Sequence, residues 1–165
     1  MAVTTGDPGP AHRALLARAI ELARDHSADG RHGPFGAVVA RGGEVVGEGW
    51  NRVVEGHDPT AHAEIMAIRA AGARLGTHVL EGCTIYASCE PCPMCLAAIY
   101  WARIGRVVFA ASRADAEAAG FDDDRIYREI GLEWPERSLE WAQALAEDGI
   151  QVLEAWRKNP HKRPY

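Results

Sequence analysis

Two short motifs, each placed where a helix is expected to begin, constrain this chain more than any other feature. The first joins His62 and Glu64 across one alanine, and the second sets Cys92 and Cys95 three positions apart behind a proline. Cysteines at this spacing in a first helical turn can direct both sulfur atoms at one centre, and zinc binds thiolate sulfur and imidazole nitrogen. The positive end of each helix favours the thiolate form that a metal needs. The sequence therefore predicts one zinc ion held by His62, Cys92 and Cys95.

The number of ligands distinguishes a catalytic zinc site from a structural one. Three protein ligands leave the fourth tetrahedral position to water, which is the arrangement of catalytic sites. Glu64 lies two residues after His62 and is not needed as a ligand, so we expect it to carry protons to and from that water. A structural site would recruit Cys83 or Cys89 as a fourth ligand and would leave Glu64 without a role. We therefore interpret Cys83 and Cys89 as packing residues.

The cysteine content and the net charge narrow the class of protein. The chain has 165 residues and a formal net charge of −5, which suits a single domain over residues 11–165 behind a flexible lead-in of residues 1–10. It has no apolar run of the ~20 residues that a membrane span needs, and no apolar stretch that suits a signal peptide. We expect a cytoplasmic protein, whose reduced thiols bind metal. The acidic balance disfavours nucleic acids and membranes as partners.

Hydrophobic periodicity predicts helices alternating with strands. Helices are expected at 11–26, at 61–73 with Thr60 as a cap, at 92–102 with Pro91 in the first turn, at 121–129 and at 150–158. Strands are expected at 35–40 and 44–50, which form a hairpin followed by a loop at 51–59, and at 83–88 and 107–111. This order predicts an α/β layered fold with parallel pairing in the later part of the sheet.

The motif residues resemble the cytidine deaminase superfamily, and more closely the bacterial guanine deaminases. The zinc deaminases carry a histidine and a glutamate two apart, followed by a proline and two cysteines three apart. The resemblance covers nearly the whole chain from the first helix onward. The segments that carry it are 34–37, 58–64, 88–95, 98–103, 119–123, 126–127 and 155–157, together with Asn51 and Tyr165.

This resemblance implies an architecture and an assembly. It implies a three-layer α/β/α fold around a five-stranded mixed sheet, with one zinc ion in each subunit. It also implies a homodimer in which the C-terminal segment, about residues 150–165, is swapped to cover the active site of the partner. A swap would explain why the tail that ends at Tyr165 has nothing local to pack on.

The resemblance also implies roles for further residues. Those implied in substrate binding are Phe35, Asn51, Ala63, Trp101 and Tyr165. Among these, Asn51 would hydrogen-bond the purine ring and Tyr165 would close the pocket from the other subunit. Asp123 would recognise the amidine edge or move a proton, and whether Asp122 or Asp123 is the second acidic group stays open at this point.

The resulting hypothesis is a zinc-dependent hydrolase acting on cyclic amidines, which converts guanine and water to xanthine and ammonia. Zinc-bound hydroxide would attack C2 while Glu64 carries the proton. One alternative is a deaminase of related small bases, such as the triazine ammeline, isoguanine or cytosine analogues. A second is a tRNA adenosine deaminase, which segments 61–67 and 103–109 also resemble. A third, non-enzymatic alternative is a zinc-stabilised module that binds a purine without hydrolysing it.

Overall fold

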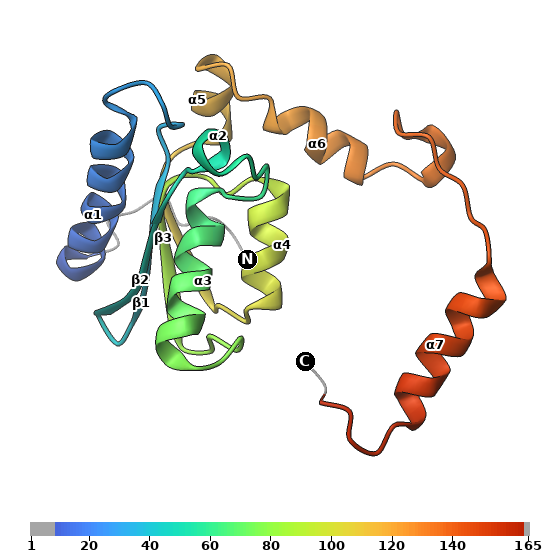
Figure 1. Ribbon diagram of the computed structural model, residues 1–165. Coiled ribbons are helices and arrows are strands. Elements are labelled where there is room, and N and C mark those ends of the chain that lie inside the picture. Colours follow the sequence, from blue (N-terminus) through green and yellow to red (C-terminus); the bar gives the residue numbers. More distant parts are fainter. Residues whose placement is uncertain (1–8, 164–165) are drawn as a thin grey trace. The chain divides into compact units, whose positions relative to one another are not determined.

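A computed structural model describes residues 9–163 of the chain (Figure 1). The chain divides into two compact units. The first unit ends at Tyr127, and the second begins at Arg128. The predicted flexible lead-in lies mostly outside the described residues, and the first helix, α1, starts at Pro10. None of the helices in the described part of the chain combines the length and the hydropathy needed to cross a membrane.

The first unit is built on a mixed sheet of four strands in the order β2-β1-β3-β4. Their bounds are β1 Gly36–Arg41, β2 Glu44–Trp50, β3 Cys83–Cys89 and β4 Arg106–Ala111. Strand β1 pairs antiparallel with both β2 and β3, and β3 pairs parallel with β4. The α/β class and the parallel pairing are confirmed, but the prediction of five strands is wrong for the described residues. The segment 112–163 holds no valine-rich run that could form a fifth strand.

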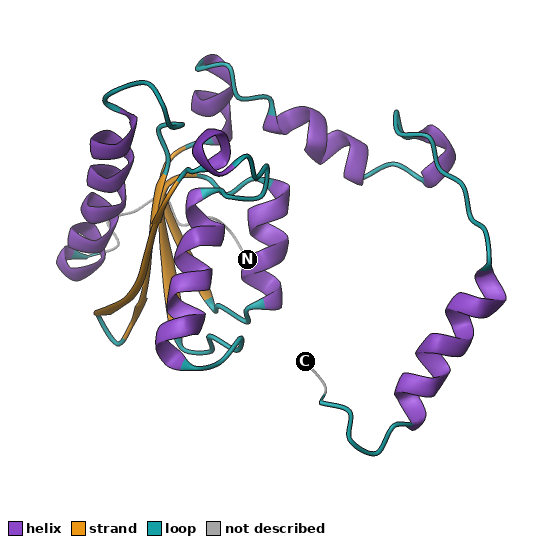
Figure 2. Cartoon of the chain, in the orientation of Figure 1, coloured by secondary structure: helices purple, strands orange, loops and turns teal. Residues whose placement is uncertain are grey.

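Helices cover both faces of the sheet (Figure 2). Helix α1, Pro10–Ser27, covers one face through a cluster that includes Ala19, Leu22 and Tyr86. Helices α3, Ala63–Leu75, and α4, Pro93–Trp101, cover the other face over a larger apolar core. The first unit therefore has the three layers that the resemblance implied.

The contact between α3 and strand β2 is close because glycines on the strand meet alanines on the helix. A Cβ atom at Gly49 would lie 2.5 Å from the backbone nitrogen of Ala67 and closer still to the carbonyl oxygen of Ala63. Gly47 meets the backbone of Ala67 and Ala71 in the same way. Small residues at these positions therefore let the helix backbone lie directly against the strand, up to the first turn of α3.

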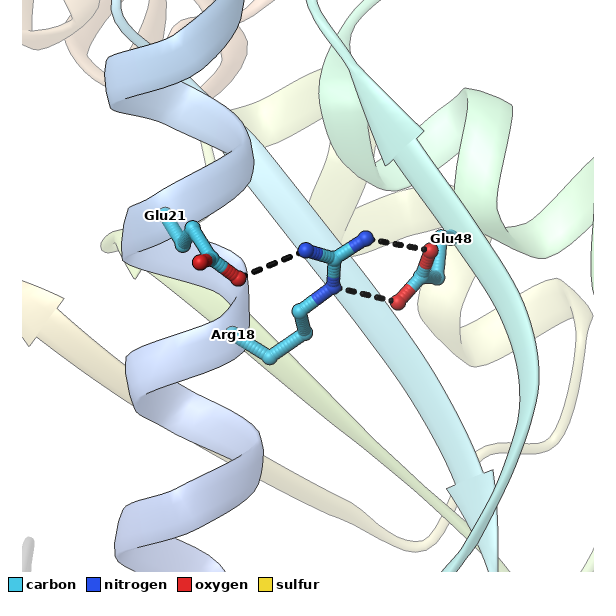
Figure 3. A network of polar contacts seen from close by, with 3 residues as sticks. All are labelled: Arg18, Glu21 and Glu48. Carbon is cyan, nitrogen blue, oxygen red and sulfur yellow. Dashed lines mark hydrogen bonds and ion pairs between the residues drawn. The ribbon is translucent and has the colours of Figure 1, made fainter.

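An ion pair links α1 to β2 on the other face of the sheet (Figure 3). The guanidinium of Arg18 donates from Nε to Oε1 of Glu48 at 2.8 Å and from Nη2 to Oε2 at 3.1 Å. The same guanidinium donates to Glu21 at 2.6 Å. The hydrogen bond from Arg18 holds the pKa of Glu48 below its usual value.

The helices that carry the two motifs begin later than predicted, α3 by two residues and α4 by one. Helix α3 begins at Ala63 with His62 as its N-cap, because Asp58 accepts the backbone N–H of Thr60 at 2.8 Å and holds the preceding residues in a turn. Thr60 is therefore not the cap. Helix α4 has Cys92 as its N-cap, so that Pro93 rather than Pro91 occupies its first turn.

Two short helices were not predicted, and two predicted ones differ in extent. The short helices are α2, Val53–Gly56, inside the predicted loop, and α5, Arg113–Ala118, after β4. The others are α6, Asp123–Ile130, and α7, Ala146–Lys158. Helix α5 begins with a capping box between Ser112 and Asp115, a reciprocal pair that the hydrophobic pattern does not reveal.

The second unit is a helical segment with little buried surface of its own. Trp134, the first residue of a short 3₁₀ helix, Trp134–Glu136, stacks with Trp141, and their ring centroids are 5.6 Å apart. Helix α7 has no buried residue, and its large apolar side chains, among them Leu153 and Trp156, are exposed. Whether residues 11–165 form one domain stays a prediction.

Candidate metal centre and substrate pocket

Three potential metal ligands converge where α3 and α4 begin. The Nδ1 atom of His62 lies 3.6 Å from the Sγ atoms of both Cys92 and Cys95. A tetrahedral zinc ion with its usual bond lengths to sulfur and nitrogen separates such atoms by about 3.6 Å. The three ligand atoms all lie within 4.8 Å of one another. The separations of these donor atoms therefore suit one zinc ion.

The fold explains why residues thirty positions apart meet here. His62 and Cys92 are the N-caps of α3 and α4, and Cys95 lies in the first turn of α4. Both helices lie on one face of the sheet (Figure 1). Hydrogen bonds with the Cys95 thiol and with His62 lower the pKa of Cys92 below its usual value. They therefore favour the thiolate form of Cys92, which is the form that binds a metal.

Glu64 is a buried carboxyl beside these ligands. Glu64 lies in the first turn of α3 and only 8% of its surface is exposed. It borders the same cavity as His62 and Cys92. Burial raises the pKa of Glu64 to about 7. A carboxyl of this pKa is available in both protonation states near neutrality, as a group that both accepts and donates a proton requires.

A cavity of about 290 Å³ opens beside the cluster. This volume is close to the lower end of the range for small-molecule sites. Phe35 and Phe121 form part of its lining, and their rings pack edge to face with centroids 4.7 Å apart. The polar groups on the lining include Asn51, Ser88 and Asp123. The cavity therefore offers apolar walls and a few polar side chains to a small planar ligand.

Asn51 and Asp123, to which the family resemblance gave roles at the substrate, both border the cavity. The Oδ1 atom of Asn51 accepts the backbone N–H of Val53 at 3.3 Å, so its amide nitrogen is the part that can bind a ligand. Burial raises the pKa of Asp123 above its usual value. Asp122 instead accepts the backbone N–H of Arg125 at 3.2 Å, as a cap of α6. Of the two neighbouring carboxyls, only Asp123 therefore lines the cavity.

Two of the predicted substrate-binding residues do not line the cavity. Ala63, the first residue of α3, is fully buried in the core, and Trp101, at the end of α4, is 69% exposed. Tyr165 lies outside the described residues. The roles of these three residues stay predictions.

The two other cysteines do not join the ligand group. Cys83 is buried in the core cluster beneath α3. Cys89 borders the cavity, but its Sγ donates to the carbonyl oxygen of Ser112 at 3.6 Å, and burial raises the pKa of its thiol to about 11. Among the described residues the potential ligand group comprises His62, Cys92 and Cys95, and the interpretation of Cys89 as a packing residue stays a prediction.

Sequence reasoning gave no role to two residues that border the cavity. Phe121 contacts Phe35, and Ser88 accepts the backbone N–H of Gly36 through its Oγ at 3.0 Å. Both lie in segments that resemble the deaminase superfamily, and Ser88 directly precedes the cysteine motif. Their partners are far away in the sequence, so only the fold reveals these contacts.

Comparison with known proteins supplies the remaining findings. Residues 10–111 match the family described as the cytidine and deoxycytidylate deaminase zinc-binding region. Guanine deaminase of Bacillus subtilis (strain 168) is 46% identical over 154 residues, which cover 93% of this chain and 99% of that protein. A tRNA-specific adenosine deaminase of Aquifex aeolicus is 47% identical over 78 residues, covering 47% of this chain and 52% of that one.

Two solved structures of guanine deaminases are also similar to this chain. The X-ray structure of guanine deaminase from Bacillus subtilis, at 46% identity, superposes with a TM-score of 0.90 and covers 93% of this chain and 98% of that chain. A structure of guanine deaminase from Nitrosomonas europaea, at 35% identity, superposes with a TM-score of 0.64 and covers 74% of this chain and 77% of that chain.

Proposed function

The chain belongs to the cytidine and deoxycytidylate deaminase family, and we propose that it catalyses the hydrolytic deamination of guanine to xanthine and ammonia. The similarity to guanine deaminase carries this proposal because it extends over 93% of the chain, past the zinc-binding region that ends at residue 111. Deaminases of different substrates share that region, so the matching residues beyond it bear on the substrate. The tRNA-specific adenosine deaminase of Aquifex aeolicus matches only 47% of the chain.

We assign the metal to His62, Cys92 and Cys95, whose sulfur–nitrogen distances suit one zinc ion. When bound, zinc lowers the pKa of a water ligand to about 7 and so supplies the nucleophile at neutral pH. In the overall reaction the water oxygen bonds to C2 of guanine, the bond from C2 to the exocyclic nitrogen breaks, and the amine leaves as ammonia.

Glu64 is the group that moves the protons. It borders the cavity beside His62, so its carboxyl is within the site where water and base meet. It accepts a proton from the attacking water and donates it to a ring nitrogen of the base. The departing amine needs a further proton, which Glu64 or Asp123 delivers.

The base is held by the walls of the cavity. The amide nitrogen of Asn51 donates to an acceptor on the purine, since its oxygen is engaged by Val53. Phe35 and Phe121 contact the planar ring. Asp123 accepts from the amidine edge, where guanine carries N–H donors. A free base is small enough for this cavity. The net charge of −5 disfavours tRNA as the substrate, since contacts to phosphates need lysine and arginine.

The active protein is proposed to be a cytoplasmic homodimer with swapped C-terminal segments. The exposed apolar side chains of α7, with Leu153 and Trp156 among them, support burial against a second copy. In such a dimer Tyr165 closes the cavity of the partner, and Trp101 contributes to the same closed site. Four free cysteines, three of them bordering or forming the metal site, suit a reducing compartment.

A panel of bases assayed for ammonia release tests the substrate. We expect zinc-dependent release from guanine, and weaker or no release from isoguanine, ammeline, cytosine, adenine, guanosine and cytidine. Preference for ammeline or a cytosine analogue would favour the alternative class of small bases. Deamination of a tRNA anticodon stem-loop, with guanine untouched, would instead identify the protein as a tRNA adenosine deaminase. If none of these compounds released ammonia, the result would favour the non-enzymatic module that binds a purine.

Substitution Glu64→Gln tests the proton carrier. We expect kcat to fall by roughly 10²- to 10⁴-fold, the usual contribution of general acid–base catalysis, with one zinc ion per subunit retained. The matched control is Glu81→Gln, which changes an exposed carboxyl in the turn before β3. Near-normal turnover in Glu64→Gln would contradict this role, and metal analysis of both variants separates loss of catalysis from loss of zinc.

A further inference from the structure

A chain of contacts connects α6 to the loop that carries the cysteine motif. The hydroxyl of Tyr127 donates to the carbonyl oxygen of Pro91 at 2.9 Å. The guanidinium of Arg113 lies over the ring of Tyr127, 4.5 Å from its centroid. The backbone N–H of Arg113 in turn donates to Oε2 of Glu90 at 2.9 Å. The start of α5, the second turn of α6 and the residues before Cys92 are therefore joined in one ring of contacts.

This ring lies one helical turn from a residue of the proposed active site. Asp123 and Tyr127 are four positions apart on α6, so both side chains lie on the same face of the helix. That face meets the metal-site loop, since Tyr127 contacts Pro91 and Asp123 borders the cavity together with Cys92.

Helix α6 needs such an anchor. It has eight residues and none of them is buried, and helices this short are marginal in water without tertiary contacts. The chain enters α6 through Gly120, whose φ of 94° requires glycine, and then through Phe121, which packs on Phe35. Phe121 thus holds the entry to the helix, and Tyr127 holds its second turn.

We infer that Tyr127, braced by Arg113, is a positioning residue that holds Asp123 in the cavity. The inference rests on the proposed function, in which Asp123 binds the amidine edge or moves a proton. A carboxylate that must meet a substrate atom loses much of its effect when it is displaced by about 1 Å, because catalysis depends on orientation. The phenol stays protonated and able to donate, since burial raises the pKa of Tyr127.

Substitution Tyr127→Phe isolates the hydrogen bond. It keeps the ring, and hence the contact with Arg113, but removes the hydroxyl that donates to Pro91. We expect kcat/KM for guanine to fall about tenfold, which corresponds to about 1.4 kcal/mol in the transition state. The zinc content and the near-ultraviolet circular dichroism should be unchanged. The matched control is Tyr100→Phe, an exposed tyrosine on α4.

A double-mutant cycle decides whether Tyr127 acts through Asp123. In the Asp123→Asn background we expect Tyr127→Phe to cause no further loss, since there is no carboxylate left to position. Substitution Arg113→Lys keeps the positive charge and the backbone hydrogen bond to Glu90. We expect it to lower kcat/KM less than Tyr127→Phe does, and to have no effect in the Asp123→Asn background.

Each contrary result identifies a different failure. A further tenfold loss in the double mutant would overturn the inference, because Tyr127 would act independently of Asp123. Loss of zinc in Tyr127→Phe would also overturn it, since the hydroxyl would then support the metal loop. A wild-type protein that leaves guanine untouched would refute the proposed function instead. The same cycle, run with whichever base the panel identifies, would still test the positioning role.

Discussion

Gly33 lies against two of the side chains that form the wall of the cavity. A Cβ atom at this position would lie 3.2 Å from Cγ of Asn51 and 3.3 Å from Cδ2 of Phe35. Asn51 is buried and its oxygen is engaged by a backbone N–H, so it has little freedom to move away. The absence of a side chain at Gly33 therefore helps to set the positions of both groups proposed to hold the base.

Substitution Gly33→Ala should weaken substrate binding more than it weakens the fold. We expect the KM for guanine to rise by about three- to tenfold, because displacing two binding groups by a few tenths of an ångström costs about 1 kcal/mol. The matched control is Gly105→Ala, where an added Cβ atom meets nothing within 4 Å. Steady-state kinetics with thermal unfolding as a check measure the difference. An unchanged KM together with a lowered Tm would mean that Gly33 serves stability alone.

Spacing in the sequence predicted the metal cluster but not all of the pocket. His62, Cys92 and Cys95 could be grouped because helix geometry and zinc chemistry restrict which residues can share a metal. Asn51 and Asp123 came from the family resemblance, and the choice between Asp122 and Asp123 needed the side-chain contacts of α6. The contacts of Ser88, Phe121 and Tyr127 join segments distant in the chain, and no local pattern encodes them.

At the scale of elements, the close packing of α3 on β2 determines where the metal-binding helix begins. The carbonyl oxygen of Ala63, the residue after His62, lies against Gly49. Since backbone atoms cannot move aside as a flexible side chain can, a methyl group at Gly49 must push the first turn of α3 away from the sheet. The alanines of α3 and the glycines of β2 thus act together to place His62.

Substitution Gly49→Ala should therefore affect both stability and metal binding. We expect the free energy of unfolding to fall by about 1–3 kcal/mol, as for other overpacked cores. We also expect weaker zinc binding, because displacement of the first turn of α3 separates His62 from the two cysteines. Urea unfolding and competition with a chromophoric chelator measure these effects, again against Gly105→Ala. Lost stability with unchanged zinc affinity would show that α3 shifts as a whole.

The ion pair between α1 and β2 gives an element-scale prediction that depends on pH. The hydrogen bond from Arg18 lowers the pKa of Glu48 in the folded state from the ordinary value of 4.5. The contribution of the ion pair to stability is therefore fully present above pH 4.5, the ordinary pKa, and is lost as the pH falls through the lowered pKa of Glu48. Because the pair is partly exposed and screened by solvent, we expect Glu48→Gln to cost only about 0.5 kcal/mol at pH 7.

The pH series distinguishes this ion pair from a general packing effect. The difference in unfolding free energy between wild type and Glu48→Gln should vanish at low pH, where the wild-type carboxyl is protonated as well. The control is Glu81→Gln, whose carboxyl is exposed. A difference that persists at low pH would show that the glutamine disturbs packing rather than charge.

The elements themselves were largely predictable, and their boundaries were not. Periodicity located α1, the hairpin of β1 and β2, and the β3-α4-β4 order, because each has a strong apolar pattern. The helix starts at Ala63 and Pro93 depend on a side-chain turn at Asp58 and on the placement of Cys92 as an N-cap, which apolar spacing does not report. The fifth strand was carried over from the resemblance, and the described residues after β4 form helices and turns instead.

At the scale of the whole molecule, the second unit is difficult to explain as a free-standing body. Helix α7 exposes Ile150, Leu153 and Trp156, which recur at helical spacing along one stripe. An apolar stripe of this kind is stabilising only when another surface covers it. The proposed swapped dimer would supply that surface and would make each active site depend on two chains.

Complementation between two inactive variants tests this dependence. In a swapped dimer, the site that contains an intact Glu64 receives Tyr165 from the other chain. A heterodimer of Glu64→Gln with Tyr165→Ala then holds one site with both changes and one site with neither. We expect about half of the wild-type activity per heterodimer, since one of its two sites is complete.

The same heterodimer distinguishes the unswapped arrangement without further variants. If each chain closes its own cavity, one site lacks Glu64 and the other lacks Tyr165, so that neither is complete. Co-expression with two different affinity tags isolates the heterodimer, and ammonia release from guanine is compared with that of the two parent homodimers. Activity no higher than the mean of the parents would exclude the swap, whereas recovery well above it requires that Tyr165 act in the partner's site.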